Sequence, residues 1–315
     1  MRTTGWVGLA VLLAVGQANG EEPALKGNVT ISGAWALYPM AVRWGEEFNK
    51  LHPQVRFDTS AGGAGKGIAD ALSGAVDIGL VSREVTDGET KKGAVSLAVA
   101  RDAVVPVINV KHPALNDLLR KGVTRQAFEG LWIKGTLKTW DQAAAGLPNL
   151  PIRVYTRSDA CGAAETWARF LGGRQEDLKG TGVYGDPGLA EAVRKDPLGI
   201  GYNNVNFAYD PKTALPVAGL AILPLDRDGN GQVDNNEQFY ATRNDLTAAI
   251  ARGDYPSPPA RDLYFVVKGT PRNPVVVAFI QWVMTGGQAL LDESGYLAVS
   301  PERLQADRAK LPAAR

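Results

Sequence analysis

Cysteine and histidine are almost missing from this chain. Its 315 residues include one cysteine, Cys161, and two histidines, His52 and His112. A single cysteine excludes an internal disulfide, and the chain has no Cys/His cluster with the spacing of a zinc site. The fold must therefore be held by its hydrophobic core, together with any metal that binds through oxygen ligands.

An excess of either charge is also missing. The formal net charge is +1 at pH 7, and no long run of lysine and arginine occurs. Bulk charge therefore predicts neither a membrane-surface partner nor a nucleic-acid partner, and we expect no nucleic-acid binding.

Long hydrophobic runs are missing as well. The apolar run at residues 6–15 is about half of the ~20 residues that a membrane span needs. It follows Arg2 and precedes the small residues Ala18 and Gly20, a pattern typical of a secretory signal cleaved after Gly20. We therefore expect residues 1–20 to be a signal peptide and the mature protein to be periplasmic or secreted. No cysteine lies near that position to carry a lipid anchor.

One dense motif is present, at residues 226–237. Its twelve residues, DRDGNGQVDNNE, match the calcium loop of an EF-hand at every diagnostic position. Gly231 supplies the left-handed residue required at the sixth position. The predicted metal ligands are Asp226, Asp228, Asn230, Gln232 through its backbone carbonyl, Asp234 and Glu237. The alternative is an ordinary acidic turn, although a turn does not require a glutamate at the twelfth position.

The flanks of this loop favour a structural calcium over a regulatory one. Residues 221–225 before it have a strand pattern, and residues 245–251 after it have a helix pattern. Calcium sensors usually pair two such loops, and the chain has no second one. We therefore expect one structural calcium ion that stabilises the fold of a protein without disulfides.

Elsewhere, strand and helix patterns alternate along the chain. Strands are expected at residues 29–31, 55–59, 76–80, 104–110, 152–156, 199–202, 221–225 and 263–267. Helices are expected at residues 39–51, 68–73, 125–131, 164–171, 189–195 and 274–285, with a turn at 186–188. The alternation predicts an α/β protein with mainly parallel sheets and flanking helices.

Three of the expected turns join a strand to a helix, at residues 32–38, 60–66 and 157–164. Helix N-termini expose unpaired N–H groups and a partial positive charge, so they can bind anions. Arg157 adds a permanent cation whose donor fork suits an oxyanion. An anion site and three ordinary structural turns are both consistent with this pattern.

Four motifs in sequence order resemble the phosphate-binding members of the periplasmic solute-binding proteins, which capture substrate for phosphate ABC transporters. They are SGAWALYP at 32–39, SAGGAGK at 60–66, VDIGLVSR at 76–83 and RSDACGA at 157–163. The resemblance covers nearly the whole mature chain and implies a two-lobe, type II periplasmic-binding-protein fold with a hinge. We expect lobe 1 to comprise residues 24–107 and 260–315 and lobe 2 to comprise 108–215. Residues 216–259 would form a connecting segment.

The resemblance also implies roles for individual residues. Arg157 would clamp the anion, Asp159 would orient Arg157, and Asp77 would accept a hydrogen bond from a protonated oxyanion such as HPO₄²⁻. The other implied contacts are Ala36, Leu37, Tyr38, Gly62, Gly63, Cys161, Gly162 and Ala163. The structural alternatives are a strand-end cap for Asp77 and a surface ion pair for Arg157 and Asp159.

The chain departs from the family where the family usually has hydroxyl donors. Gly62, Cys161 and Ala163 stand at such positions, and the first loop has also lost its hydroxyls. Three lost hydrogen bonds to a charged ligand would cost ~5–9 kcal/mol, or roughly 10³–10⁶ in affinity. Phosphate would then bind weakly, the pocket would hold another ligand, or other side chains would substitute: Lys66, Ser82, Arg83 or Ser158. Trp35 is either a new element at the pocket mouth or part of the core.

Cys161 raises a rival hypothesis. A helix N-terminus near Arg157 would lower its pKa and give a reactive thiol, as in a thiol enzyme or redox sensor. A thiol enzyme also needs a base, and both histidines are distant from this turn in sequence.

Two functions remain. The first is an exported, non-enzymatic solute-binding protein, monomeric, that captures phosphate or a related oxyanion and delivers it to the membrane permease of an ABC transporter. The second is a calcium-stabilised adhesion or scaffold module on the same fold, with a drifted pocket and no role in transport. Retention of Asp77, Arg157 and Asp159 favours the first, and the loss of hydroxyl donors favours the second.

Overall fold

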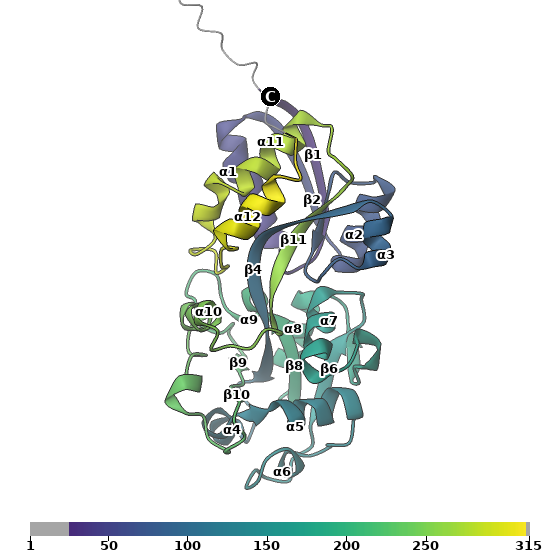
Figure 1. Cartoon of the computed structure of the whole chain (residues 1–315). Helices are drawn as coiled ribbons and strands as arrows, with labels where there is room; N and C mark the ends of the chain where they lie inside the picture. Colours follow the sequence, from purple (N-terminus) through teal and green to yellow (C-terminus); the bar gives the residue numbers. More distant parts are fainter. Residues whose placement is uncertain (1–24, 313–315) are drawn as a thin grey trace, which may run out of the picture.

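The computed structural model describes residues 25–312. Figure 1 shows them as two lobes stacked along one axis, with the first strand and the last helix both in the upper lobe. None of the helices within 25–312 is long and apolar enough to cross a membrane. The predicted signal peptide lies outside the described residues.

Lobe 1 combines the beginning and the end of the described chain. Its elements are β1 (Lys26–Gly33), α1 (Tyr38–Leu51), β2 (Gln54–Ala61), α2 (Ala64–Ser73), β3 (Ile78–Val81), α3 (Asp87–Lys91), the first part of β4 (Ala94–Asn109), most of β11 (Ala260–Lys268), α11 (Pro274–Val283) and α12 (Pro301–Arg308).

Lobe 2 is built from the middle of the chain. Its elements are the end of β4, α4 (Leu115–Lys121), β5 (Val123–Thr124), α5 (Arg125–Glu129), α6 (Trp140–Ala143), β6 (Arg153–Arg157), α7 (Gly162–Leu171), β7 (Thr181–Val183), α8 (Gly185–Lys195), β8 (Gly199–Asn204), α9 (Val205–Ala208), β9 (Leu220–Ile222), β10 (Leu225–Asp226) and α10 (Arg243–Arg252).

A nine-stranded mixed sheet runs through both lobes, in the order β2-β1-β3-β11-β4-β8-β6-β7, with β9 also paired to β4. The pairs β1–β2, β1–β3, β6–β7 and β6–β8 are parallel, as predicted. The antiparallel pair β4–β11 crosses between the lobes: β4 pairs with β11 up to Ala103 and with β8 from Val104. These two crossing strands form the hinge of the fold.

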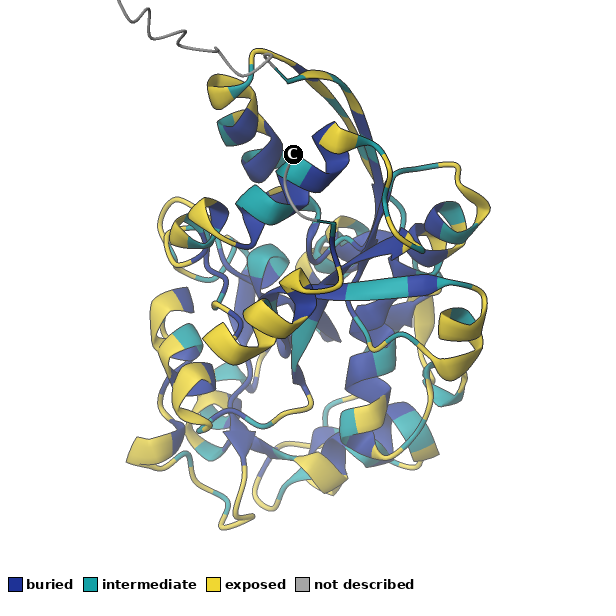
Figure 2. Ribbon diagram, turned by 45° about the horizontal axis from the view of Figure 1, so that its top comes forward, coloured by how far each residue is buried: buried dark blue, intermediate teal, exposed yellow. Residues whose placement is uncertain are grey.

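Each lobe has its own core. In lobe 1, α1 buries Trp44 and Phe48 at helical spacing, and the Trp44 ring lies 5.6 Å from Phe265 on β11. In lobe 2, Trp132 and Trp167 meet edge to face at 5.5 Å. Figure 2 shows the buried residues along the strands and the inner faces of the helices.

The two cores place the lobe boundaries differently from the prediction. The lobe 1 core ends at Ala100 and resumes at Leu263, whereas the lobe 2 core runs from Ala103 to Ala260. The chain therefore changes lobe earlier in β4 than residue 107. Residues 216–259 are not a separate segment, since their apolar side chains pack within the lobe 2 core.

Two local predictions also need correction. The turn expected at residues 186–188 is the first part of α8, because a proline is compatible with the first turn of a helix. The strand expected at residues 104–110 begins at Ala94, in a stretch where alanine, serine and arginine obscure the apolar pattern.

Candidate functional site

The three predicted strand-to-helix turns are present. They join β1 to α1, β2 to α2 and β6 to α7. The second and third turns touch across the lobe junction: the Gly65 N–H donates to the Ala160 carbonyl at 3.1 Å. A Cβ atom added to Gly63 would lie 3.0 Å from a carboxylate oxygen of Asp159. Glycine at this turn therefore lets the two lobes approach closely.

Arg157, the last residue of β6, is a buried cation beside this contact. Its Nε and Nη2 atoms lie 2.8 and 2.6 Å from the two Asp159 carboxylate oxygens. Its Nη1 lies 2.7 Å from Oδ2 of Asp186. The Arg157 side chain is 1% exposed. Burial alone would lower the pKa of Arg157, but the charges of Asp186 and Asp159 outweigh burial and raise it.

Asp186 links this cation to the crossing strands through buried polar groups. Its Oδ1 accepts a hydrogen bond from Nδ2 of Asn204 at 2.7 Å. Oδ1 of Asn204 accepts from Nη2 of Arg261, and Nε of Arg261 lies 2.9 Å from Asp102. Because Asp102 is on β4 and Arg261 is on β11, a continuous network joins Arg157 to the hinge.

Sequence reasoning missed the members of this network other than Arg157 and Asp159. Asp186 could have been found, because an acidic residue followed by proline is a typical start of a helix. The other members, Asp102, Asn204 and Arg261, carry no local pattern. Their contacts depend on how the strands pair, which a single sequence does not specify.

The position of Asp77 contradicts the role predicted for it. Its Oδ2 accepts hydrogen bonds from the backbone N–H and the hydroxyl of Thr30, at 2.8 and 2.7 Å. Asp77 precedes β3, so it lies at the amino end of that strand. The turns that meet at the junction follow the carboxyl ends of β1, β2 and β6. Asp77 therefore ties β3 to β1 and does not face Arg157.

Several of the backbone donors expected to bind the anion are already paired within or between the first two turns. In the first turn the Ala34 carbonyl accepts from the N–H groups of Leu37 and Tyr38. The N–H groups of Gly62 and Gly63 in the second turn donate to the Gly33 carbonyl of the first. The carbonyl of Ala36 accepts from the Tyr296 hydroxyl at 2.7 Å. These residues lie near the junction as expected, but the four N–H groups are already paired.

The third turn keeps unpaired donors. The N–H groups of Gly162 and Ala163 begin α7 and donate to no group within residues 25–312. Ser82, 2% exposed, lies directly against this turn, since a Cβ atom on Gly162 would come within 2.2 Å of the Ser82 Oγ. Ser82 is therefore placed to supply one of the missing hydroxyls.

The other candidate substitutes are engaged elsewhere or face away. Lys66 forms an ion pair with Asp70. Arg83 bonds to both carboxylate oxygens of Glu89, at 3.0 and 2.8 Å. Ser158 packs its Cβ against the backbone of β7.

Cys161 is buried rather than reactive. Its Sγ accepts from the Ala164 N–H at 3.5 Å and so caps the start of α7. Burial raises the pKa of the Cys161 thiol to about 12, although Arg157 lowers it in part. The prediction of a lowered thiol pKa is wrong, so the thiol hypothesis loses its physical basis.

Trp35 lies between the lobes and belongs to neither core. Its ring meets Tyr184 and Phe207 of lobe 2 edge to face, at 6.4 and 6.3 Å, and Tyr38 of lobe 1 at 6.4 Å. A Cβ atom on Gly185 would lie 3.3 Å from the Trp35 ring. Trp35 therefore forms an apolar wall of the junction.

A cavity of about 300 Å³ opens beside this junction. Arg83 lines it from lobe 1, Thr166 and Arg169 line it from lobe 2, and Arg261 lines it from the hinge. Arg157 does not line this cavity. Because Arg157 is buried, an anion can reach it only when the lobes separate.

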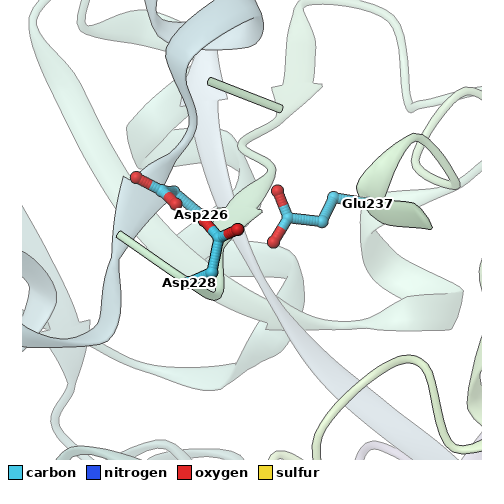
Figure 3. A group of neighbouring side chains, drawn as sticks. All are labelled: Asp226, Asp228 and Glu237. Atoms are coloured by element: carbon cyan, nitrogen blue, oxygen red, sulfur yellow. The ribbon is translucent and has the colours of Figure 1, made fainter. Parts of the chain in front are cut away.

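The predicted calcium loop brings three carboxylates together, as Figure 3 shows. Asp226, Asp228 and Glu237 place oxygen atoms within 4.8 Å of one another. Gly231 has φ +80°, the left-handed conformation that the sixth position requires. The donor set of carboxylate and amide oxygens fits a hard cation such as calcium.

The remaining predicted ligands lie in the same turn and bond to one another. Nδ2 of Asn230 donates to Asp228 at 3.0 Å and to Asp234 at 2.8 Å. Oδ1 of Asn230 accepts from the Gln232 N–H at 2.8 Å. These hydrogen bonds link Asp228, Asn230 and Asp234 to one another within the loop.

The loop at residues 226–237 is attached to lobe 2 beside α4 and β10, on the other side of the lobe from α7 (Figure 1). The Val233 N–H donates to the Arg120 carbonyl at the end of α4, at 2.9 Å. β10 pairs in parallel with β5 just before the loop, and α10 follows it. The incoming strand and the outgoing helix agree with the predicted flanks.

Comparisons with known proteins agree with this architecture. Residues 18–286 match the PBP superfamily domain. The chain is 23% identical over 309 residues to the phosphate-binding protein PstS of Staphylococcus aureus, covering 96% of this chain and 88% of that protein. The PstS of Staphylococcus haemolyticus is 23% identical over 91% of this chain and 85% of its own length.

Solved structures share the fold at lower identity. A protein of Clostridium perfringens solved with bound phosphate superposes with a TM-score of 0.70 at 19% identity, covering 87% of this chain and all of that one (100%). An ABC-type phosphate transport receptor of Vibrio cholerae gives a TM-score of 0.61 at 18% identity, covering 86% of this chain and 100% of its own.

Proposed function

The chain belongs to the PBP superfamily, and from that membership we propose that it is an exported solute-binding protein that captures phosphate or a related oxyanion for an ABC transporter. The observation that carries the proposal is Arg157, a buried cation at the lobe junction beside the free N–H groups of Gly162 and Ala163. The names of the phosphate-binding relatives support the same ligand class.

Capture proceeds by hinge motion without covalent chemistry. The lobes separate about β4 and β11, and an oxyanion enters beside Arg157. It binds the guanidinium and the first N–H groups of α7, which carry the positive end of the helix dipole. Closure then covers the anion with the Gly62–Gly63 turn, and the closed form docks on a membrane permease. A monomer suffices, because one chain supplies both lobes.

Affinity for phosphate is lower than a full set of hydroxyl donors would give. With Ser82 replacing one of three lost hydroxyls, two remain unreplaced, which corresponds to about 3–6 kcal/mol. This estimate predicts binding weaker by roughly 10²–10⁴ than in a protein that keeps all three hydroxyls.

Thermal melting with tetrahedral anions tests this function. Phosphate, arsenate, sulfate, molybdate and tungstate are each added at millimolar concentration, with and without calcium. At least one should raise the melting temperature. If none does, and equilibrium dialysis also detects no binding, the transport function fails and the non-transport module on the same fold becomes the better proposal.

Export is part of the same proposal. Residues 1–20 are removed as a signal peptide, and the mature protein is periplasmic or secreted. Expression of the full chain in a bacterium, followed by N-terminal sequencing of the product, should give Glu21 as the first residue. An intact N-terminus on a cytoplasmic product would contradict export.

We also propose that the loop at residues 226–237 binds one structural calcium ion. The convergence of Asp226, Asp228 and Glu237 within 4.8 Å supports this proposal. The ion would take further oxygens from Asn230, the carbonyl of Gln232 and Asp234. Isothermal titration of chelator-treated protein should give about one calcium per chain and weaker binding of magnesium. If the calcium titration gives no heat and calcium does not raise the melting temperature, the proposed site is rejected.

A further inference from the structure

We propose that Asp186 makes the anion site selective for singly charged oxyanions over doubly charged ones. This inference rests on the proposed anion-binding function and specifies the charge of the ligand. It starts from the contact between Asp186 and Arg157 at 2.7 Å, in which both side chains are 1% exposed.

Arg157 has little capacity left for a strongly charged ligand. A guanidinium has five N–H donors, of which three already point at carboxylates of this chain. Arg157 contributes +1, and Asp159 and Asp186 contribute −1 each, so the group has a net charge of −1. An incoming anion therefore meets free donors but also a surplus negative charge.

Asp186 is held in place rather than free to swing away. Its Oδ1 accepts from the Asn204 side chain at 2.7 Å, and its backbone carbonyl accepts from Nδ2 of Asn203 at 3.0 Å. Asn204 is in turn bonded to Arg261. When the lobes open, all of the contacts between Asp186 and lobe 2 can persist, so its charge stays beside Arg157.

The neighbouring cations do not offset this charge. Arg261 is paired with Asp102 at 2.9 Å, and Arg83 with Glu89 at 2.8 Å. Coulomb repulsion is proportional to the charge of the ligand, so a doubly charged anion suffers about twice the repulsion of a singly charged one. The N–H groups of α7 favour both anions and do not remove this difference.

Perrhenate and tungstate provide the first test. Both are tetrahedral oxyanions of similar size, with one and two negative charges. We expect Asp186→Asn to increase tungstate affinity about tenfold more than perrhenate affinity. Asp117→Asn, an exposed lobe 2 residue with the same change in net charge, is the matched control and should leave the affinity ratio unchanged. An equal change for both anions in Asp186→Asn would overturn the proposal.

A second measurement uses the unmodified protein, in case Asp186→Asn does not fold. Inorganic phosphate is mostly doubly charged at about pH 8. If the site takes the singly charged form, titration calorimetry in buffers of different ionisation heat should detect uptake of about one proton per phosphate bound. Binding without proton uptake would overturn the proposal.

The outcomes also separate this inference from the proposed function. If the unmodified protein binds anions with no proton uptake, only the inference fails. If the unmodified protein binds perrhenate in preference to tungstate but binds no phosphate or arsenate, the inference stands and the proposed phosphate-capture function fails. If neither protein binds any anion, both fail.

Discussion

The proposed calcium loop and the Arg157 network differ in how they are assembled. The loop takes its predicted ligands from twelve consecutive residues, Asp226 to Glu237. The network joins residues far apart in sequence: Asp102 and Arg261, for example, are separated by 159 positions. A local turn can organise the first site, whereas the second exists only after the strands have paired.

The two sites also differ in burial, and therefore in what a substitution should do. In the loop Asp228 is exposed, whereas Asp226 and Glu237 are buried. Arg157 and Asp186 are both almost fully buried and form an ion pair. Removing one partner of a buried ion pair leaves an uncompensated charge in the protein interior, whereas Glu237→Gln removes a charge and leaves none uncompensated unless a metal is bound. The following predictions test this contrast, from the largest expected effect to the smallest.

Arg157→Ala should have the largest effect. It leaves the carboxylates of Asp159 and Asp186 buried without their cation, so the free energy of unfolding should fall by about 3–5 kcal/mol. Any anion-induced rise in melting temperature should also disappear. Urea denaturation and thermal melting measure the two effects.

The control for Arg157→Ala is Arg120→Ala. Arg120 is an exposed residue that pairs with Asp117 on the surface, so its loss should change stability by about 0.5 kcal/mol at most. Equal losses in the two variants would mean that the Arg157 network is not a buried structural unit.

Glu237→Gln should come next. At a calcium concentration 100 times the dissociation constant, a bound ion stabilises the fold by about 2.7 kcal/mol, and the variant should lose most of this. Anion affinity should change little, because the loop lies on the other side of lobe 2 from α7 (Figure 1).

The control for Glu237→Gln is to compare its melting temperature with that of the unmodified protein in the presence of a calcium chelator. Without calcium the two proteins should melt at nearly the same temperature. A large loss of anion affinity in calcium would instead show that the loop influences the hinge.

Cys161→Ser should have a moderate effect on binding. It places a hydroxyl donor beside Arg157 and should raise anion affinity about tenfold, the lower end of the value of a hydrogen bond to a charged group. Ala163→Gly, in the same turn, adds no donor and serves as the control. Unchanged affinity in Cys161→Ser would place the anion away from this turn.

The native thiol should also be inert. Because burial raises the pKa of Cys161 to about 12, a thiol reagent should label it slowly in the folded protein and rapidly in urea. Fast labelling of the folded protein would revive the thiol hypothesis.

Glu89→Gln should have the smallest effect, and one that depends on pH. Partial burial would raise the pKa of Glu89, but hydrogen bonds from Arg83 and Thr86 outweigh it and lower the pKa from 4.5 to about 2. The ionised carboxylate therefore stabilises the fold above about pH 4.5, and this contribution is lost as the pH falls towards 2.

The measurement for Glu89 is urea denaturation at several pH values. The variant should be less stable than the unmodified protein by about 1 kcal/mol at most near neutral pH, since the pair is partly solvated. The difference should shrink as the pH approaches 2. A difference independent of pH would assign the effect to packing rather than charge.

The sequence by itself determined the local features of this protein. Strand and helix periodicity located the three turns, and glycine and acidic residues located the loop at 226–237. These features depend on residues close together in the chain, where spacing and backbone preference decide the conformation. The two-lobe fold was implied by the resemblance of four motifs to the phosphate-binding solute-binding proteins.

Only the tertiary structure decided which side chains face Arg157. Asp77 lies near the right motif but at the wrong end of β3, while Asp186 was assigned to a turn and proved to be its buried partner. The tertiary structure also places the apolar side chains of residues 216–259 in the lobe 2 core and shows that the Cys161 thiol is buried. The physical reason is that burial and long-range ion pairs follow from strand order and lobe closure, which couple residues that no local spacing connects.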